Sequence, residues 1–173
     1  MNTLLLRHKK DPGPGIRRAH PATLCVPPLR CTTIAPKPET PIMTPPIVTH
    51  RGQCHCGAIR FEVEAPADIE ASRCNCSICS MAGFLHLIVP RSRFRASGDH
   101  KMTTYRFNTG IAQHTFCPIC GIKPFYVPRS NPDGVSVNVN CLDSATIASI
   151  RETPFDGRHW EQNADSLRHL FEQ

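Results

Sequence analysis

The chain has 173 residues, of which 40% are hydrophobic and 20% charged, and its formal net charge is +6. This length predicts one domain with a tail, and no apolar run approaches the ~20 residues of a membrane helix, so we expect a soluble protein. Most of the positive charge lies in residues 1–50, which contain no aromatic residue to stack on a base. The basic character therefore does not indicate a nucleic-acid partner.

The first 46 residues are rich in proline and basic residues. Residues 1–50 hold ten of the 17 prolines, a composition that buries too little apolar surface to become ordered. We therefore predict a disordered extension over residues 1–46, in which Cys25 and Cys31 are free thiols. Its arginines and few acids also resemble a mitochondrial presequence, and Met43 is an alternative start. No secretory signal is visible, so the expected compartment is the cytoplasm, with mitochondrion and nucleus as alternatives.

Residues 50–173 show the patterns of a folded domain. Ile59, Phe61 and Val63 alternate with charged residues, the period of a strand with one buried face. Other strands are predicted at residues 86–89, 104–107, 112–116, 123–127 and 135–139, with turns at 108–110 and 131–134. About six strands in all predict a mainly β domain.

One helix is predicted near the end of the chain. Four apolar residues recur at i, i+4, i+7 and i+11: Trp160, Ala164, Leu167 and Phe171. This spacing is typical of an amphipathic helix. We expect the apolar stripe to pack against the sheet.

The cysteines carry the strongest functional signal. Seven of the ten fall into three clusters, Cys54 and Cys56, then Cys74, Cys76 and Cys79, then Cys117 and Cys120. Disulfides, an iron–sulfur cluster and plain core packing are the alternatives to a metal site. Disulfides need an oxidising compartment, and the spacing matches neither ferredoxin pattern. Closely spaced cysteines in a reducing compartment favour zinc.

Two of the clusters predict a structural zinc site with four ligands. Cys54 and Cys56 are expected to enter the first strand, where residues two apart point to the same side. Cys117 and Cys120 flank a short turn, and Gly121 after them can adopt a positive φ that turns backbone amides toward the thiolates. Four cysteines from two distant segments would complete a tetrahedral site.

The remaining cluster, Cys74, Cys76 and Cys79, offers three ligands from one loop. A zinc ion with three protein ligands keeps a position for water or substrate, the arrangement of catalytic sites. The open position would accept a thiol or an aldehyde oxygen. The alternative is a second structural zinc completed by Cys141, His55 or His86. Cys141 is expected to be a buried small side chain instead.

Four motifs of the chain resemble one known family. They are Gly52-Gln-Cys-His-Cys-Gly-Ala-Ile-Arg-Phe61, Cys74-Asn-Cys-Ser-Ile-Cys79, Thr115-Phe-Cys-Pro-Ile-Cys-Gly121 and Tyr126-Val-Pro-Arg-Ser-Asn-Pro-Asp-Gly134. Together they resemble the glutathione-dependent formaldehyde-activating enzymes and, in detail, the eukaryotic branch represented by centromere protein V. The resemblance implies an Mss4-like β-tent, mainly β, with zinc-stapled antiparallel strands and a C-terminal helix. It also implies a structural zinc on the four cysteines and a second zinc on the other three.

The resemblance implies a substrate as well. A carbon–sulfur lyase of this family adds the thiol of glutathione to formaldehyde, giving S-hydroxymethylglutathione. Glutathione carries two carboxylates, so Arg129 and Asn131 are candidate contacts, although Arg129 could equally be a solvated charge in a turn. The rival function, from the same resemblance, is a scaffold that binds chromatin or microtubules through structural zincs. The natural aldehyde or thiol and the oligomeric state stay open.

Overall fold

The computed structural model describes the main chain of residues 45–171 and the side chains of residues 45–167. The disorder predicted over residues 1–46 and the free thiols of Cys25 and Cys31 fall almost wholly on residues 1–44, outside this described part. Within residues 45–171, no helix combines the length and the apolar character needed to cross a bilayer.

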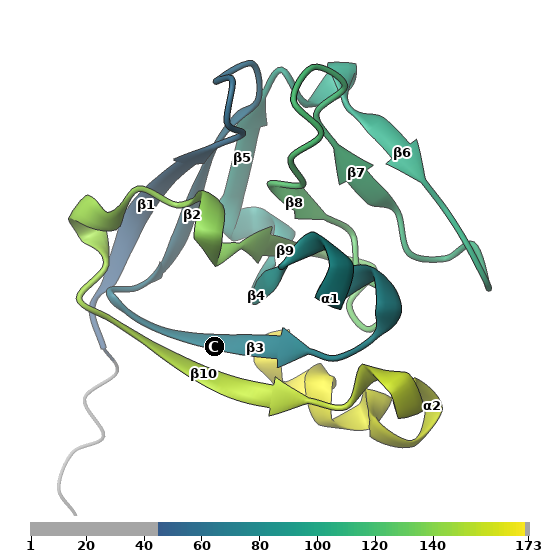
Figure 1. Ribbon diagram of the computed structural model, residues 1–173. Helices are drawn as coiled ribbons and strands as arrows, with labels where there is room; N and C mark the ends of the chain where they lie inside the picture. The colour runs from purple at the N-terminus through teal and green to yellow at the C-terminus, as the bar shows by residue number, and fades with distance from the viewer. Residues whose placement is uncertain (1–44, 172–173) are drawn as a thin grey trace, which may run out of the picture. The chain divides into compact units, whose positions relative to one another are not determined.

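Two sheets and a short hairpin build the described region (Figure 1). The first sheet has the order β1-β2-β5 and is antiparallel, with β1 at Ile47–Gln53, β2 at Arg60–Pro66 and β5 at Phe94–Ser97. In β2, Phe61, Val63 and Ala65 are buried and Arg60 is exposed, so the alternation predicted for this strand is confirmed.

The second sheet has five strands in the order β10-β3-β4-β9-β8. They are β3 (Asp68–Cys74), β4 (Leu85–Pro90), β8 (Phe125–Tyr126), β9 (Gly134–Asn138) and β10 (Ser149–Phe155). The strands pair antiparallel except for β3 and β10, which run parallel. All five residues of β9 are buried, which fits a central strand covered on both faces.

The hairpin consists of β6 (Thr103–Tyr105) and β7 (His114–Phe116). The predicted turn between them is present, with Gly110 N–H donating to the Phe107 carbonyl at 3.0 Å. The mainly β prediction is therefore confirmed. Residues 45–171 hold ten strands rather than about six, because β1, β3, β5 and β10 were not predicted.

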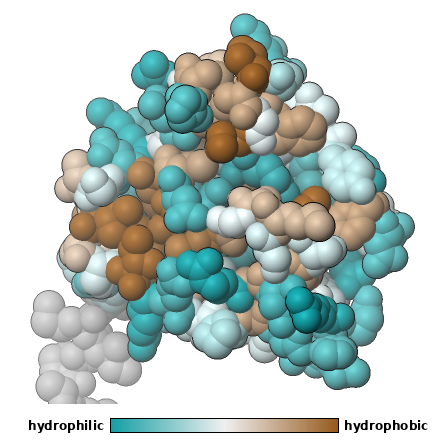
Figure 2. All heavy atoms as spheres, in the orientation of Figure 1, coloured by the Kyte–Doolittle hydropathy of each residue, from teal (hydrophilic) through white to brown (hydrophobic). Residues whose placement is uncertain are grey.

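Three aromatic rings join the two sheets. Phe61 of β2 and Phe94 of β5 contact Phe125 of β8, with ring centroids 5.6 and 4.7 Å apart, respectively. Both contacts have the edge-to-face geometry that aromatic pairs favour. The core therefore lies between the sheets. On the surface seen in Figure 2, the largest group of apolar residues lies on the side of β1 and β2, and hydrophilic residues cover much of the rest.

The helices are short. They are α1 (Ser77–Ala82), α2 (Trp160–Asn163) and the 3-10 helices Arg91–Arg93, Asp99–Lys101, Val139–Cys141, Ser144–Thr146, Gly157–His159 and Ala164–Phe171. The predicted C-terminal helix is present, but only its first four residues are α-helical and the rest is a 3-10 helix that contacts β4.

Candidate metal centres

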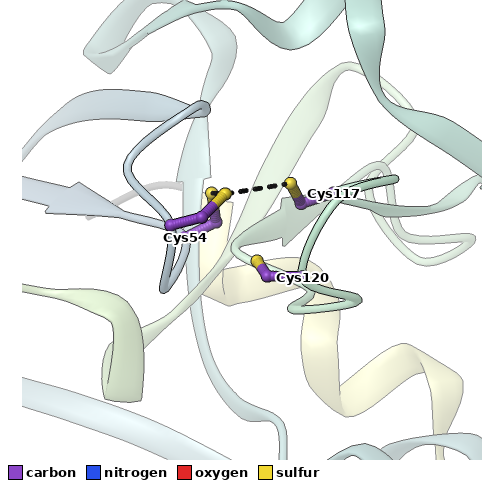
Figure 3. A group of neighbouring side chains, drawn as sticks. Cys54, Cys117 and Cys120 are labelled. Carbon is purple, nitrogen blue, oxygen red and sulfur yellow. Dashed lines mark hydrogen bonds between the residues drawn. The ribbon is translucent and has the colours of Figure 1, made fainter.

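A first cluster brings four cysteines together from two segments far apart in the chain (Figure 3). Cys54 and Cys56 lie between β1 and β2, and Cys117 and Cys120 follow β7. The Sγ atom of Cys56 lies 3.6 Å from that of Cys54 and 3.7 Å from that of Cys117. We call this set the four-cysteine cluster.

Tight turns, not strands, present these sulfurs. Cys54 N–H donates to the Ile59 carbonyl at 3.0 Å, so residues 54–59 form a turn. The expectation that Cys54 and Cys56 lie on an extended strand is therefore wrong. On the other side, Gly121 has a φ of 74°, the positive value that the sequence predicted, and its N–H donates to the Cys117 carbonyl at 2.9 Å.

The four-cysteine cluster fits a tetrahedral metal ion. Four ligands at a metal–sulfur distance of about 2.3 Å lie roughly 3.8 Å from one another, close to the separations found here. Backbone amides face the sulfurs as well, since the Ile59 N–H donates to Cys54 Sγ at 3.3 Å. Hydrogen bonds from the backbone of Ile122 and of Cys56 lower the pKa of Cys120 to about 6. At Cys56 a hydrogen bond from the Ala58 backbone lowers the pKa, but burial and the neighbouring thiols outweigh it and raise the pKa to about 12. The cluster thus favours a thiolate, the form that binds metal, at Cys120.

A second cluster consists of Cys74, Cys76 and Cys79, whose sulfurs also lie within 4.8 Å of one another. We call it the three-cysteine cluster. Cys74 ends β3, Cys76 is the N-cap of α1 and Cys79 is buried inside that helix. A strand end followed directly by a helical turn therefore places all three sulfurs on one side.

The electrostatics of the three-cysteine cluster favour negative charge at Cys76. Hydrogen bonds from the Cys74 thiol, then the Cys79 thiol and the first backbone amides of α1, lower the pKa of Cys76 to about 2. The same thiol contacts, together with burial, raise the pKa of Cys79. In the described residues neither Cys141 nor a histidine belongs to either set of neighbouring ligand atoms.

Gly157 lies against this cluster. Because β10 runs parallel to β3, the two strands end side by side and the residues that follow them are neighbours. Asn75, the residue after β3, donates its N–H to the Phe155 carbonyl at 3.1 Å. The Asn75 side chain also accepts from the Arg158 N–H at 3.0 Å. A Cβ atom on Gly157 would lie 2.3 Å from Cys74 Sγ. Only glycine fits between the C-terminal segment and this sulfur.

The three-cysteine cluster opens onto a cavity of about 450 Å³. Apolar and aromatic side chains line much of it, including Phe107, Tyr126, Trp160 and Leu167. Two arginines, Arg129 and Arg158, line it as well. A larger and more open hollow of about 1120 Å³ adjoins Cys54 and Cys141 but holds no residue of the three-cysteine cluster.

A group of polar side chains lies beside the cavity. The Nδ1 atom of His86 is 3.0 Å from Ser136 Oγ, and Lys123 Nζ is 3.3 Å from His114 Nδ1. Burial lowers the pKa of both histidines to about 4, with Lys123 adding to the effect. Burial likewise lowers the pKa of Lys123 and raises that of Tyr126. At neutral pH the imidazoles of His86 and His114 are therefore neutral, and the phenol of Tyr126 is protonated.

The two candidate glutathione contacts occupy different positions. Arg129 lines the cavity, with its guanidinium carbon 3.5 Å above the Trp160 ring and a nitrogen 2.9 Å from Glu161. Asn131 is buried, and its main-chain carbonyl accepts a hydrogen bond from Gly134 N–H at 3.0 Å in the predicted turn. It is not among the residues that line the cavity, and its Oδ1 has no partner within the described region.

Several residues of this site were not singled out in the sequence. Trp160 was assigned only to a helix stripe, Tyr126 only began a family motif, and Gly157, Arg158 and Ser136 were assigned no role. No short-range spacing connects these residues, because they converge through the pairing of distant strands. His86 was considered only as a metal ligand. Cys141 lies near the first cluster without joining it, with its thiol 4.0 Å from the Lys123 carbonyl, and is partly rather than fully buried.

Comparisons with known proteins agree with this arrangement. The family model described as glutathione-dependent formaldehyde-activating enzyme matches residues 49–156. A putative enzyme of that name from Halomonas elongata is 57% identical over 28 residues, which span 16% of this chain and only 18% of that protein. A Rhodobacter sphaeroides protein of known crystal structure is 36% identical with a TM-score of 0.51, over 60% of this chain and 99% of that one. The matched region contains both cysteine clusters, and the chain belongs to the family of glutathione-dependent formaldehyde-activating enzymes.

Proposed function

We propose that the protein adds the thiol of glutathione reversibly to formaldehyde or a related small aldehyde, giving S-hydroxymethylglutathione. The observation that carries this proposal is the cavity in which the three-cysteine cluster and two arginines line one hollow. A thiophilic metal site suits the sulfur of glutathione, and guanidinium groups suit its carboxylates. Membership of the family supports the class of reaction.

Two zinc ions belong to the proposal, one for each cysteine cluster. The four-cysteine cluster would hold a closed structural site, and the three-cysteine cluster would hold an ion with one position left for a ligand. When bound there, zinc supplies positive charge that stabilises a thiolate and polarises a carbonyl.

The protein's own contribution is positioning. The reaction forms a bond between the sulfur and the carbonyl carbon, the carbonyl π electrons move to the oxygen, and the thiol proton ends on that oxygen. No further reactant is consumed. Apolar walls such as Phe107 and Trp160 would exclude water and hold the two reactants together in the cavity.

Arg129 is the proposed partner for a glutathione carboxylate. Its side chain is 18% exposed and stacked on Trp160, so the guanidinium is already held in place. Its present partner Glu161 is 80% exposed, and an ion pair with so exposed a partner contributes little to stability. A substrate carboxylate could replace it. Asn131 stays in the proposal as a second contact, but its buried amide oxygen could accept only from an N–H of glutathione, and the side chain would first have to reach the cavity, which it does not line.

Purified protein is expected to contain two zinc ions per chain, since the seven clustered cysteines form two ligand sets. Elemental analysis by mass spectrometry measures this. One ion per chain, or iron with visible absorption, would contradict the two-site assignment.

Glutathione is expected to bind with release of a proton, because a thiol with a pKa near ~8.5 must ionise to become a metal ligand. Calorimetry in two buffers of different ionisation enthalpy detects that proton. Cys79→Ser should abolish the proton release, and S-methylglutathione, whose sulfur is blocked, should release none from the wild type.

Turnover is measured as exchange between formaldehyde and S-hydroxymethylglutathione, against the uncatalysed rate. Wild-type protein should exceed both that rate and the rate with Cys79→Ser. If the wild type neither binds glutathione nor accelerates exchange, the lyase proposal is wrong and the scaffold function takes its place. Deletion of residues 1–45 would then remove the remaining function.

A further inference from the structure

His86 has a ring nitrogen for which the fold provides no partner. The residue lies on β4, lines the cavity of the three-cysteine cluster and is only 6% exposed. Its Nδ1 is occupied by Ser136, whereas its Nε2 is buried and has no hydrogen-bond partner among residues 45–167. Buried nitrogens are rarely left unpaired. A ligand in the cavity is the natural partner.

The neighbours of His86 decide which nitrogen carries the proton. The neighbour that matters is Ser136 on β9, whose Oγ lies 3.0 Å from His86 Nδ1. If Ser136 donates to Nδ1, the neutral ring carries its own proton on the other nitrogen. The opposite direction would put the ring proton on Nδ1 and leave Nε2 as an acceptor. The first arrangement puts the imidazole proton on Nε2.

Resting on the function proposed above, we infer that the Nε2–H of His86 donates a hydrogen bond to the oxygen of the bound aldehyde and to the same oxygen as it becomes negative during addition. The fixed donor stabilises the charge that develops when the carbonyl π electrons move to oxygen. His86 keeps its own proton, and the proton lost by the glutathione thiol reaches the oxygen through solvent. His86 is therefore a catalytic residue and not a metal ligand, in agreement with its absence from the three-cysteine set.

Two substitutions at this position separate the two ring nitrogens. In His86→Asn the short amide can keep the contact with Ser136 but nothing replaces Nε2. In His86→Gln the longer amide places an N–H donor near the position of Nε2. Circular dichroism and zinc content should be unchanged in both variants, and glutathione alone should bind with wild-type affinity.

The first readout is binding. Wild-type protein should bind S-hydroxymethylglutathione more tightly than S-ethylglutathione, which carries a methyl group in place of the hydroxyl. Excess formaldehyde in the solution keeps the S-hydroxymethylglutathione from dissociating into glutathione and formaldehyde. His86→Asn should reduce this preference about tenfold, and His86→Gln should retain most of it. The exchange rate above the uncatalysed rate should fall at least ~10-fold in His86→Asn and less in His86→Gln.

The second readout needs no substrate. Nitrogen NMR of the zinc-loaded protein at neutral pH should show a neutral His86 with its proton on Nε2. A proton on Nδ1, or an undiminished preference for the hydroxyl in His86→Asn, overturns the inference while leaving the lyase proposal intact. Failure of the wild type to bind glutathione overturns the lyase proposal, and the role of His86 with it.

Discussion

Cys117→Ser is expected to prevent the domain from folding. Cys117 is fully buried, and its cluster connects the turn between β1 and β2 to the segment after β7. The binding energy of a structural zinc is folding energy, on the order of 10 kcal/mol or more in small peptides. Loss of one ligand from a closed site should therefore cost more than the domain's whole stability. Circular dichroism melts and zinc analysis measure the effect.

Two matched substitutions test the cause. Cys141→Ser makes the same chemical change at a thiol that belongs to neither cluster, so it should retain the fold and both zinc ions. Cys76→Ser should lose one zinc ion and still unfold cooperatively, at a temperature below that of the wild type, whereas Cys117→Ser should show no unfolding transition. An equal loss of thermal stability in Cys117→Ser and Cys76→Ser would show that the two sites do not differ in their structural importance.

Gly157→Ala is expected to disable the three-cysteine cluster while leaving the fold in place. The added Cβ would lie 2.3 Å from Cys74 Sγ and 3.2 Å from the Cys76 Cβ. The first contact is intolerable and the second is tight, so relief requires the cysteine loop or the C-terminal segment to move. Zinc content should fall to about one ion per chain, since a closed site elsewhere keeps its own ligands, and the heat of glutathione binding should disappear.

The control for Gly157→Ala is Gly110→Ala, in the turn between β6 and β7. A Cβ at Gly110 meets no atom within 4 Å, although the positive φ there makes alanine mildly unfavourable. Gly110→Ala should bind two zinc ions and glutathione normally. If Gly157→Ala does the same, Cys74 does not hold metal at the position found in the structure.

The sequence predicted those parts of the molecule that depend on short-range patterns. The cysteine spacings specified the three-cysteine cluster and each pair of the four-cysteine cluster, because ligands two or three residues apart converge without help from the rest of the fold. The meeting of the two pairs, with Cys56 and Cys117 61 residues apart, was inferred from the number of ligands that a closed zinc site needs. The alternation around Phe61 specified β2 for the same reason. β10 could not be predicted in this way, since six of its seven residues are exposed and it shows no alternation. Its parallel partner β3 is distant in the chain, with Asn75 and Asp156 81 residues apart.

The cavity depends on long-range pairing and could not be read from spacing. His86 and Ser136 are 50 residues apart and meet only because β4 pairs with β9. The turn at Cys54 was mistaken for a strand because hydrophobic alternation begins only a few residues later. Local propensity does not reveal that the Cys54 amide and the Ile59 carbonyl close a loop.

The parallel pairing of β3 with β10 brings together two parts of the cavity wall, and the family model covers only one of them. The family model ends at residue 156, whereas Gly157, Arg158, Trp160 and Leu167, which complete the cavity wall, lie beyond it. The matched region thus carries the cysteines, and the segment after it completes the space above them. Substitutions in this segment can therefore reshape the cavity without altering a cysteine, provided that glycine or an equally open main chain passes Cys74.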